Sequence, residues 1–64
     1  MKIDKAKFDM LCAERMLNAT DVAKHSGVTY GTIYKSFKND VRPSTIGKIA
    51  YVLCVSPSDL IVKE

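Results

Sequence analysis

The sequence has 64 residues and a mildly basic composition, with ten lysines and arginines against seven aspartates and glutamates. This length predicts a single domain over residues 1–64 and excludes large enzymes, multidomain receptors and repeat arrays. No apolar run approaches the roughly 20 residues of a membrane span, and the opening residues contain no apolar signal region. We therefore expect a cytoplasmic protein that does not associate with membranes.

Helical spacing of apolar residues recurs along the chain, whereas the alternation typical of strands is absent, so we predict an all-α fold. A first helix is expected over about residues 4–16. Its apolar stripe is predicted to comprise Ile3, Phe8, Leu11, Cys12 and Met16.

The next two helices are predicted mainly from their capping residues. Asn18, with Asp21 three residues later, is typical of a capping box. The helix that it begins is expected to end at Gly27, because a positive φ costs least at glycine. Thr29 is expected to cap a third helix over about residues 30–38.

Two further helices are predicted in the last third of the chain. The first, over about residues 45–53, has the clearest amphipathic pattern. Its buried positions are Ile46, Ile49, Ala50 and Leu53. Residues 56–59, Ser-Pro-Ser-Asp, combine an N-cap, a proline at the first helical position and an acid in the first turn. They predict a short fifth helix carrying Leu60 and Ile61, and the whole is expected to form a compact five-helix bundle.

The excess positive charge is concentrated in one part of the chain. Residues 29–48 contain four bases and one acid, whereas the rest of the sequence contains six of each. The bases of this window are Lys35, Lys38, Arg42 and Lys48. A net charge of +3 alone supports a polyanionic partner weakly, but its confinement to one window strengthens the case for nucleic acid.

Residues 17–37 have the features of a helix–turn–helix. That motif needs a small residue where the helices touch, a residue that tolerates positive φ in the turn, and apolar residues that lock the second helix. The residues that meet these needs at the expected offsets are Ala23, Gly27, Val28 and Ile33.

With these residues, the chain resembles the lambda-repressor-like family of DNA-binding domains (Cro and phage-repressor, or XRE, type) over about residues 8–62. A second motif, from Arg42-Pro-Ser-Thr to Val-Ser-Pro-Ser-Asp-Leu60, is similar to the family's fourth and fifth helices. The resemblance implies a sequence-specific transcriptional regulator that binds double-stranded operator DNA. We expect a repressor of phage, plasmid or mobile-element type, associated with the nucleoid of a bacterial or phage-infected cell.

Three positions depart from the family pattern. Ala19 stands where a glutamine often opens the second helix and supports a base-reading residue. Cys12 and Phe37 occupy the places of an arginine and a glutamate that often pair, so we expect an apolar contact between them. Cys54 replaces the usual turn glycine, and a positive φ there would cost roughly 1 kcal/mol.

The exposed face of the third helix carries the candidate DNA contacts. On a helical wheel, Ile33, Ser36 and Phe37 lie on the side that docks on the bundle. The resemblance implies that the first half of this helix enters the major groove, with base-reading residues Tyr30, Gly31, Tyr34 and Lys35. The predicted phosphate-contacting residues are Asn18, Thr29, Lys38, Asn39, Arg42 and Ser44.

Less specific interpretations of these residues stay open. Asn18 and Thr29 could act only as helix caps. Tyr34 could shield the edge of the bundle without touching bases. Lys35 and Lys38 could form an ordinary solvated face.

Regulators of this type usually dimerise, because one short helix specifies few base pairs, and we expect a homodimer. The predicted interface residues, which are more apolar than a monomer needs, are Tyr51, Val52, Val55, Leu60, Ile61 and Val62. The alternative is a protein-interaction module, such as an antitoxin or antirepressor, that uses the same fold.

The sequence has none of the residue combinations that an enzyme of this size would need. No nucleophile–base pair, catalytic carboxylate pair or metal-ligand cluster is evident, and His25 is expected to be a surface residue. Cys12 and Cys54 are expected to be buried as small apolar residues. We predict no catalysis, no metal, no cofactor and no small-molecule ligand.

Overall fold

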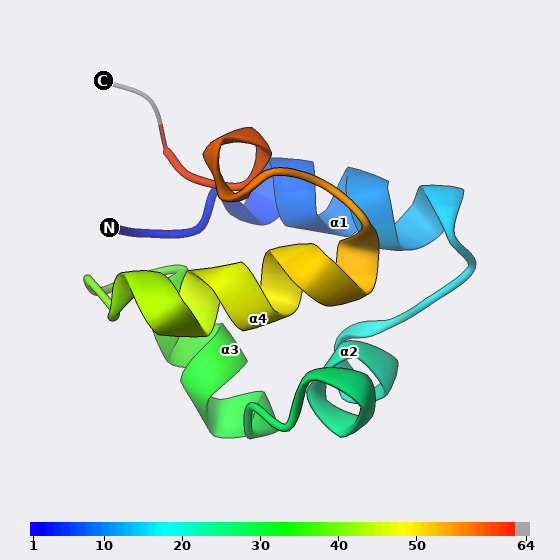
Figure 1. Ribbon diagram of the computed structural model, residues 1–64, viewed down its shortest axis with the longest axis horizontal. Helices are drawn as coiled ribbons and strands as arrows, with labels where there is room; N and C mark the ends of the chain where they lie inside the picture. The colour runs from blue at the N-terminus through cyan, green and yellow to red at the C-terminus, as the bar shows by residue number, and fades with distance from the viewer. Residues whose placement is uncertain (63–64) are drawn as a thin grey trace.

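The computed structural model describes residues 1–62 and confirms the all-helical fold (Figure 1). Its elements are α1 (Lys5–Glu14), α2 (Ala19–Ser26), α3 (Tyr30–Ser36), α4 (Pro43–Leu53) and a 3-10 turn, η1 (Pro57–Asp59). No helix in this part of the chain has the length and apolar character needed to cross a membrane.

The prediction of a fifth α-helix is wrong, because the segment after α4 makes one 3-10 turn and then extends. The Leu60 N–H donates to the Pro57 carbonyl at 3.0 Å, which closes the turn. Two residues later the Val62 N–H donates to the Lys2 carbonyl at 2.9 Å. The Val62 N–H, which would donate within a fifth helix, therefore donates to the N-terminal segment instead.

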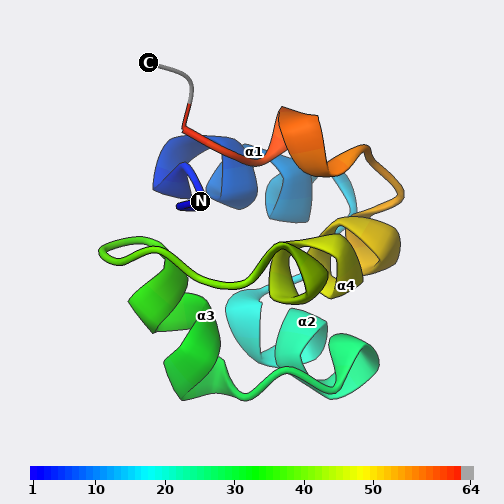
Figure 2. The same cartoon turned by 60° about the vertical axis from the view of Figure 1, so that its left-hand side comes forward.

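α4 lies in the middle of the molecule, with α1 and η1 on one side of it and α2 and α3 on the other (Figures 1 and 2). Its predicted apolar stripe forms the centre of the core, where Ile46, Ile49 and Leu53 are fully buried. The buried side chains that pack around it from the other elements are Ile3, Phe8, Cys12, Val22, Val28, Ile33 and Leu60. This arrangement leaves the outer faces of α2 and α3 together on one side of the molecule.

Two helices are shorter than predicted at their C-terminal ends. α1 ends at Glu14, and Met16 has a φ of 54° and a side chain that is 93% exposed, so its predicted place in the apolar stripe is wrong. α3 ends at Ser36, and turn-type bonds such as that from the Lys38 N–H to the Lys35 carbonyl (3.1 Å) follow it. At the other end, Pro43 begins α4 two residues earlier than predicted.

The first four residues form an extended segment that holds α3 and the C-terminal segment together. The Ile3 N–H donates to the Ser36 carbonyl at 2.9 Å, and Ile3 also forms an isolated antiparallel bridge with Ile61. Ile3 is buried as predicted but in extended rather than helical backbone. The Asp4 side chain then caps α1 by accepting from the Lys7 N–H at 3.2 Å. The C-terminal end of α3 is therefore fixed by contacts with residues far away in the sequence.

Candidate nucleic-acid interface

The turn between α2 and α3 has the predicted helix–turn–helix geometry. Gly27 caps α2 in the left-handed region, with a φ of 76°, and its N–H donates to the Ala23 carbonyl at 3.1 Å. Val28 and Ile33 are both buried and lock α3 onto the core. The small residue, the turn glycine and the apolar anchors thus occupy the positions that the sequence indicated.

The outer face of α3 presents all four predicted base-reading residues to solvent. Tyr30 and Tyr34 have exposed fractions of 44% and 46%, and Gly31 and Lys35 are also exposed. Ser36, on the opposite face, is fully buried, in agreement with the helical wheel. The structure therefore brings the four together on one accessible surface.

A chain of aromatic rings connects this surface to the core. The Phe8 and Phe37 ring centroids lie 5.2 Å apart, those of Phe37 and Tyr34 5.9 Å, and those of Tyr34 and Tyr30 4.9 Å. Tilted and edge-on pairs at these separations contribute roughly 0.5–1.5 kcal/mol each beyond burial. The two tyrosines are therefore held in place by contacts with one another and with Phe37. A direct contact between Cys12 and Phe37 stays a prediction, although both belong to or pack against the same core cluster.

The Tyr30 side chain interacts with its neighbour Tyr34 on α3. Hydrogen bonding with the neighbouring Tyr34 side chain raises the pKa of Tyr30 above its ordinary value, with smaller contributions from desolvation and from the Tyr34 charge. The hydroxyl is therefore neutral at physiological pH. A neutral phenol can donate to a base or to a phosphate, and it can accept from a base.

Gly31 is not required by the packing of the protein itself. A Cβ atom built at this position would meet no protein atom within 4 Å, and its φ is not in the left-handed region. A glycine inside a helix costs stability relative to alanine. The packing of the protein therefore gives no reason for a glycine at this position.

Lys35 shares an open depression with residues of the loop between α3 and α4. The depression has a volume of about 590 Å³. Its lining residues are Thr32, Lys35, Asp40, Val41, Arg42 and Thr45. The structure thus places the predicted base reader Lys35 close to the predicted phosphate contact Arg42. Thr32 and Thr45 were not predicted, because neither carries charge and their proximity arises only from the folding of the loop.

Asn18 is confirmed as a helix cap, and this limits how it could hold an anion. Its side chain accepts from the Asp21 N–H at 2.9 Å, while its own N–H donates to the Asp21 carboxylate at 3.0 Å. The carboxylate therefore already occupies the N-terminus of α2, where an anion is favoured. Neither bond uses the Asn18 side-chain amide N–H groups, which remain for a phosphate.

Thr29 is also confirmed as a cap. Its hydroxyl accepts from the Thr32 N–H at 3.2 Å and lies 2.8 Å from the Thr32 hydroxyl. Both side chains are at the N-terminus of α3, close in the chain to Tyr30. The capping role does not exclude a phosphate contact, because Thr29 is exposed.

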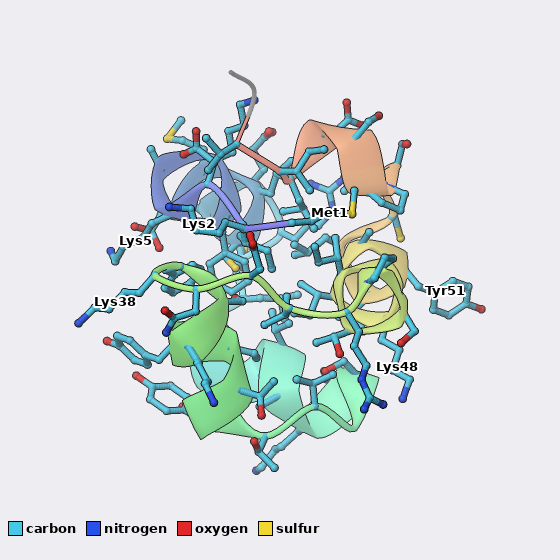
Figure 3. The ribbon with its side chains drawn as sticks, turned by 90° about the vertical axis from the view of Figure 1, so that its left-hand side faces the viewer. Met1, Lys2, Lys5, Lys38, Lys48 and Tyr51 are labelled. Atoms are coloured by element: carbon cyan, nitrogen blue, oxygen red, sulfur yellow. The ribbon has the colours of Figure 1, made fainter. Side chains whose placement is uncertain are left out.

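The remaining predicted phosphate contacts lie at two separate places. Lys38 and Asn39 are exposed in the turn after α3, and the Lys38 side chain extends from the same side of the molecule as Lys5 (Figure 3). Ser44 instead lines a groove of about 350 Å³ between the end of α2 and α4, together with His25 and Lys48. The structure therefore does not gather all six predicted phosphate contacts into one patch.

Comparison with known proteins decides the family. The model of the Cro/C1-type HTH DNA-binding domain matches residues 7–64 of this chain. The chain belongs to this family. No curated protein matches it.

One solved structure is similar to this Cro/C1-type domain over nearly its whole length. It is a mutant of hydroxyethylphosphonate dioxygenase, with 24% sequence identity and a TM-score of 0.82. The match covers 98% of the present chain but only 14% of the dioxygenase chain. At this identity the likeness supports the fold alone. The family itself is a DNA-binding domain, which agrees with a regulator that acts on DNA.

The predicted dimer residues of the Cro/C1-type domain differ widely in exposure. Tyr51 is 85% exposed and Val62 is 40% exposed. The residues that are partly buried against the core are Val52, Val55 and Ile61. Leu60 is fully buried within the core of the monomer, so it offers no surface to a second copy.

The two cysteines are also placed differently from one another. Cys12 is buried as predicted, and desolvation raises the pKa of its thiol. Cys54 is exposed, so its predicted burial is wrong, because the residue caps α4 in the left-handed region with a φ of 58° and points outward. Within residues 1–62, no group of three His, Cys, Asp or Glu side chains is arranged to hold a metal ion.

Proposed function

We propose that this domain is a sequence-specific regulator of transcription, of repressor type, which places α3 in the major groove of double-stranded operator DNA. The observation that carries the proposal is the outer face of α3, where exposed Tyr30, Gly31, Tyr34 and Lys35 face solvent on a firmly anchored helix. Membership of a DNA-binding family supports the same conclusion. Occupation of the operator would exclude RNA polymerase and so repress the gene.

Within this proposal, the four residues of α3 have different roles. Lys35 donates to the O6 and N7 atoms of guanine. Tyr30 donates a hydrogen bond from its neutral hydroxyl or packs against a thymine methyl. Tyr34 packs against the Tyr30 ring and so fixes its position. Gly31 lets the helix backbone come close to the base pairs. Each good base contact contributes about 1–3 kcal/mol of discrimination.

Residues around this face position the domain on the DNA backbone. The proposed donors are the Arg42 guanidinium, which shares a depression with Lys35, and the side-chain amide of Asn18. Further backbone contacts are proposed for Thr29, Lys38, Asn39 and Ser44, which lie at separate places around the domain. Contacts of this kind set the register without reading sequence.

Operator recognition is proposed to require two copies of the domain. α3 has seven residues, which reach only a few base pairs, so one copy discriminates poorly. Two copies on half-sites about one helical turn apart would double the number of base contacts. Tyr51 and Val62 are the exposed members of the proposed interface, and its partly buried members are Val52, Val55 and Ile61. Sedimentation across a concentration series tests this, and a monomer at every concentration that also binds its operator singly would contradict it.

Competition between DNA duplexes tests sequence-specific binding. A labelled duplex that the protein binds tightly is challenged with unlabelled duplex of random sequence at about 150 mM salt. Specific sites are typically bound 10³–10⁷-fold more tightly than random DNA, so the complex should survive a large excess of competitor. Loss of the complex at equal concentrations of competitor would contradict the proposal.

A protein-interaction module is the second candidate, and one observation favours it. The groove between α2 and α4 has the 85% exposed Tyr51 at its edge, and exposed aromatic side chains are common anchors of protein interfaces. This function predicts sequence-blind DNA binding that vanishes near physiological salt. Replacement of Tyr51 by alanine would then abolish partner binding, whereas under the DNA-binding proposal it would weaken dimerisation and, through it, operator binding.

A further inference from the structure

The fold brings basic residues from the start of the chain next to the C-terminal end of α3. Lys2 is anchored through its neighbours, because the Ile3 N–H donates to the Ser36 carbonyl of α3 (2.9 Å) and the Val41 N–H donates to the Met1 carbonyl (2.8 Å). Lys5 follows directly as the first residue of α1. In Figure 3, the side chains of Lys5 and Lys38 extend toward the same side of the molecule, with Lys2 next to them. Lys2 and Lys5 are more than 30 residues away from Lys38 along the sequence, so the charge window of residues 29–48 contains Lys38 but misses the other two.

Lys5 also lies within electrostatic reach of the proposed base-reading face. A hydrogen bond to Asp9 is the main cause that raises the pKa of Lys5, but the Tyr34 hydroxyl adds a smaller contribution of the same sign. Lys5 and Tyr34 are therefore near enough for their charges to interact, although they belong to different helices.

The present partner of Lys5 holds it only weakly. The Lys5 ammonium lies 2.8 Å from the Asp9 carboxylate, and both side chains are more than half exposed. Exposed pairs of this kind contribute little and are screened by salt. The order, with lysine four residues before the acid, is also the less favourable one on a helix. Lys5 is moreover at the N-terminus of α1, where a cation opposes the helix dipole. Lys5 therefore contributes little to the stability of the fold. Its ammonium group can leave Asp9 and bind a phosphate instead.

We propose that Lys2, Lys5 and Lys38 form a second phosphate-binding patch, which holds one DNA strand where it leaves the C-terminal end of α3. This inference rests on the proposed DNA-binding function and deepens it, because it assigns backbone contacts to the N-terminal segment. The patch adds affinity and salt dependence without reading sequence. It lies on the opposite side of the molecule from Lys48 and Tyr51 (Figure 3).

Salt dependence of DNA binding tests the patch directly. Each phosphate contact contributes about 0.9 to the slope of log K against log salt. Lys2→Gln and Lys5→Gln should each reduce this slope by about 0.9 for every copy of the protein that is bound. For each copy, the loss of affinity between 50 and 200 mM salt then becomes roughly 3.5-fold smaller. Lys48→Gln is the matched control, because it removes the same charge from an exposed helix position on the opposite side, and it should leave the slope unchanged.

Two further variants separate a local contact from a general effect of net charge. Lys5→Gln combined with Asp9→Asn has the net charge of the parent protein, yet it should keep the reduced slope. Lys5→Arg retains the charge and should restore the slope of the parent. Thermal melts check that each variant folds, which is expected because both lysines are exposed.

The outcomes distinguish this proposal from the proposed function. The slopes are measured on a random-sequence duplex as well as on the tightest duplex, so they report backbone contacts even if no specific site exists. Slopes for Lys2→Gln and Lys5→Gln equal to that of Lys48→Gln would overturn the patch while leaving sequence-specific binding intact. Reduced slopes without discrimination between duplexes would support the patch and refute sequence-specific regulation.

Discussion

Replacement of Gly31 by alanine separates what α3 needs for folding from what it needs for DNA binding. The added Cβ atom would meet no protein atom within 4 Å, so no steric cost opposes the substitution inside the protein. Alanine is favoured over glycine in a helix by about 0.5–1 kcal/mol. Because Gly31 is only the second residue of α3, we expect a gain at the lower end of this range. For a domain of this size that gain raises Tm by about 2–4 °C.

The same methyl group should weaken DNA binding, because it projects from the surface that faces the base pairs. Loss of one close base contact costs about 1–3 kcal/mol, which corresponds to a roughly 5- to 150-fold weaker Kd. Fluorescence anisotropy with a labelled operator measures the affinity, and thermal melts measure the stability. Gly47→Ala is the matched control, since its Cβ also meets no atom within 4 Å, but it lies in α4. It should stabilise the fold and leave DNA affinity unchanged. An unchanged affinity for Gly31→Ala would refute the close approach of α3 to DNA.

Three other predictions concern residues around the site. Cys54→Gly should raise the free energy of unfolding by about 1 kcal/mol in denaturant melts, because a φ of 58° is strained for any residue with a Cβ; a destabilised variant would contradict this. Phe37→Ala should lower the free energy of unfolding, because the Phe37 ring packs on Phe8 and Tyr34. The expected loss is about 2 kcal/mol, which is less than for a fully buried phenylalanine. A variant as stable as the parent would show that the aromatic contacts are unimportant for stability. Native protein treated with iodoacetamide should be alkylated at exposed Cys54 well before Cys12, whose thiol pKa is raised by burial; mass spectra with equal modification of the two would refute the assigned burial.

Much of the helix–turn–helix could be predicted because its determinants are local. The capping box at Asn18, the left-handed turn at Gly27 and the cap at Thr29 each depend on residues within one helical turn, and all three are confirmed. The division of α3 into a buried and an exposed face follows from helical periodicity in the same way. Exposure of a face does not by itself identify its ligand, so the roles of Tyr30 and Lys35 still depend on binding experiments.

The features that were missed depend on contacts between distant parts of the chain. Helical spacing placed Ile3 on α1, but pairing with Ser36 and Ile61 holds it in extended backbone. The C-terminal segment is extended in the same pairing, and Leu60 next to it is buried. A local sequence pattern could equally place Leu60 on the surface. Proximity of Lys2 and Lys5 to α3 arises from this segment as well. No local pattern encodes such contacts, because they are decided only when the helices pack.

Selection of bound sequences from a pool of random duplex DNA tests the central claim most directly. The account predicts that the parent protein enriches a short motif, present as two half-sites if the protein binds as a dimer. Lys35→Ala should enrich the same motif with relaxed preference at a guanine position, because one base contact is lost while the rest of α3 is unchanged. Enrichment of no motif by the parent protein, under conditions in which it binds DNA, would contradict sequence-specific recognition by α3.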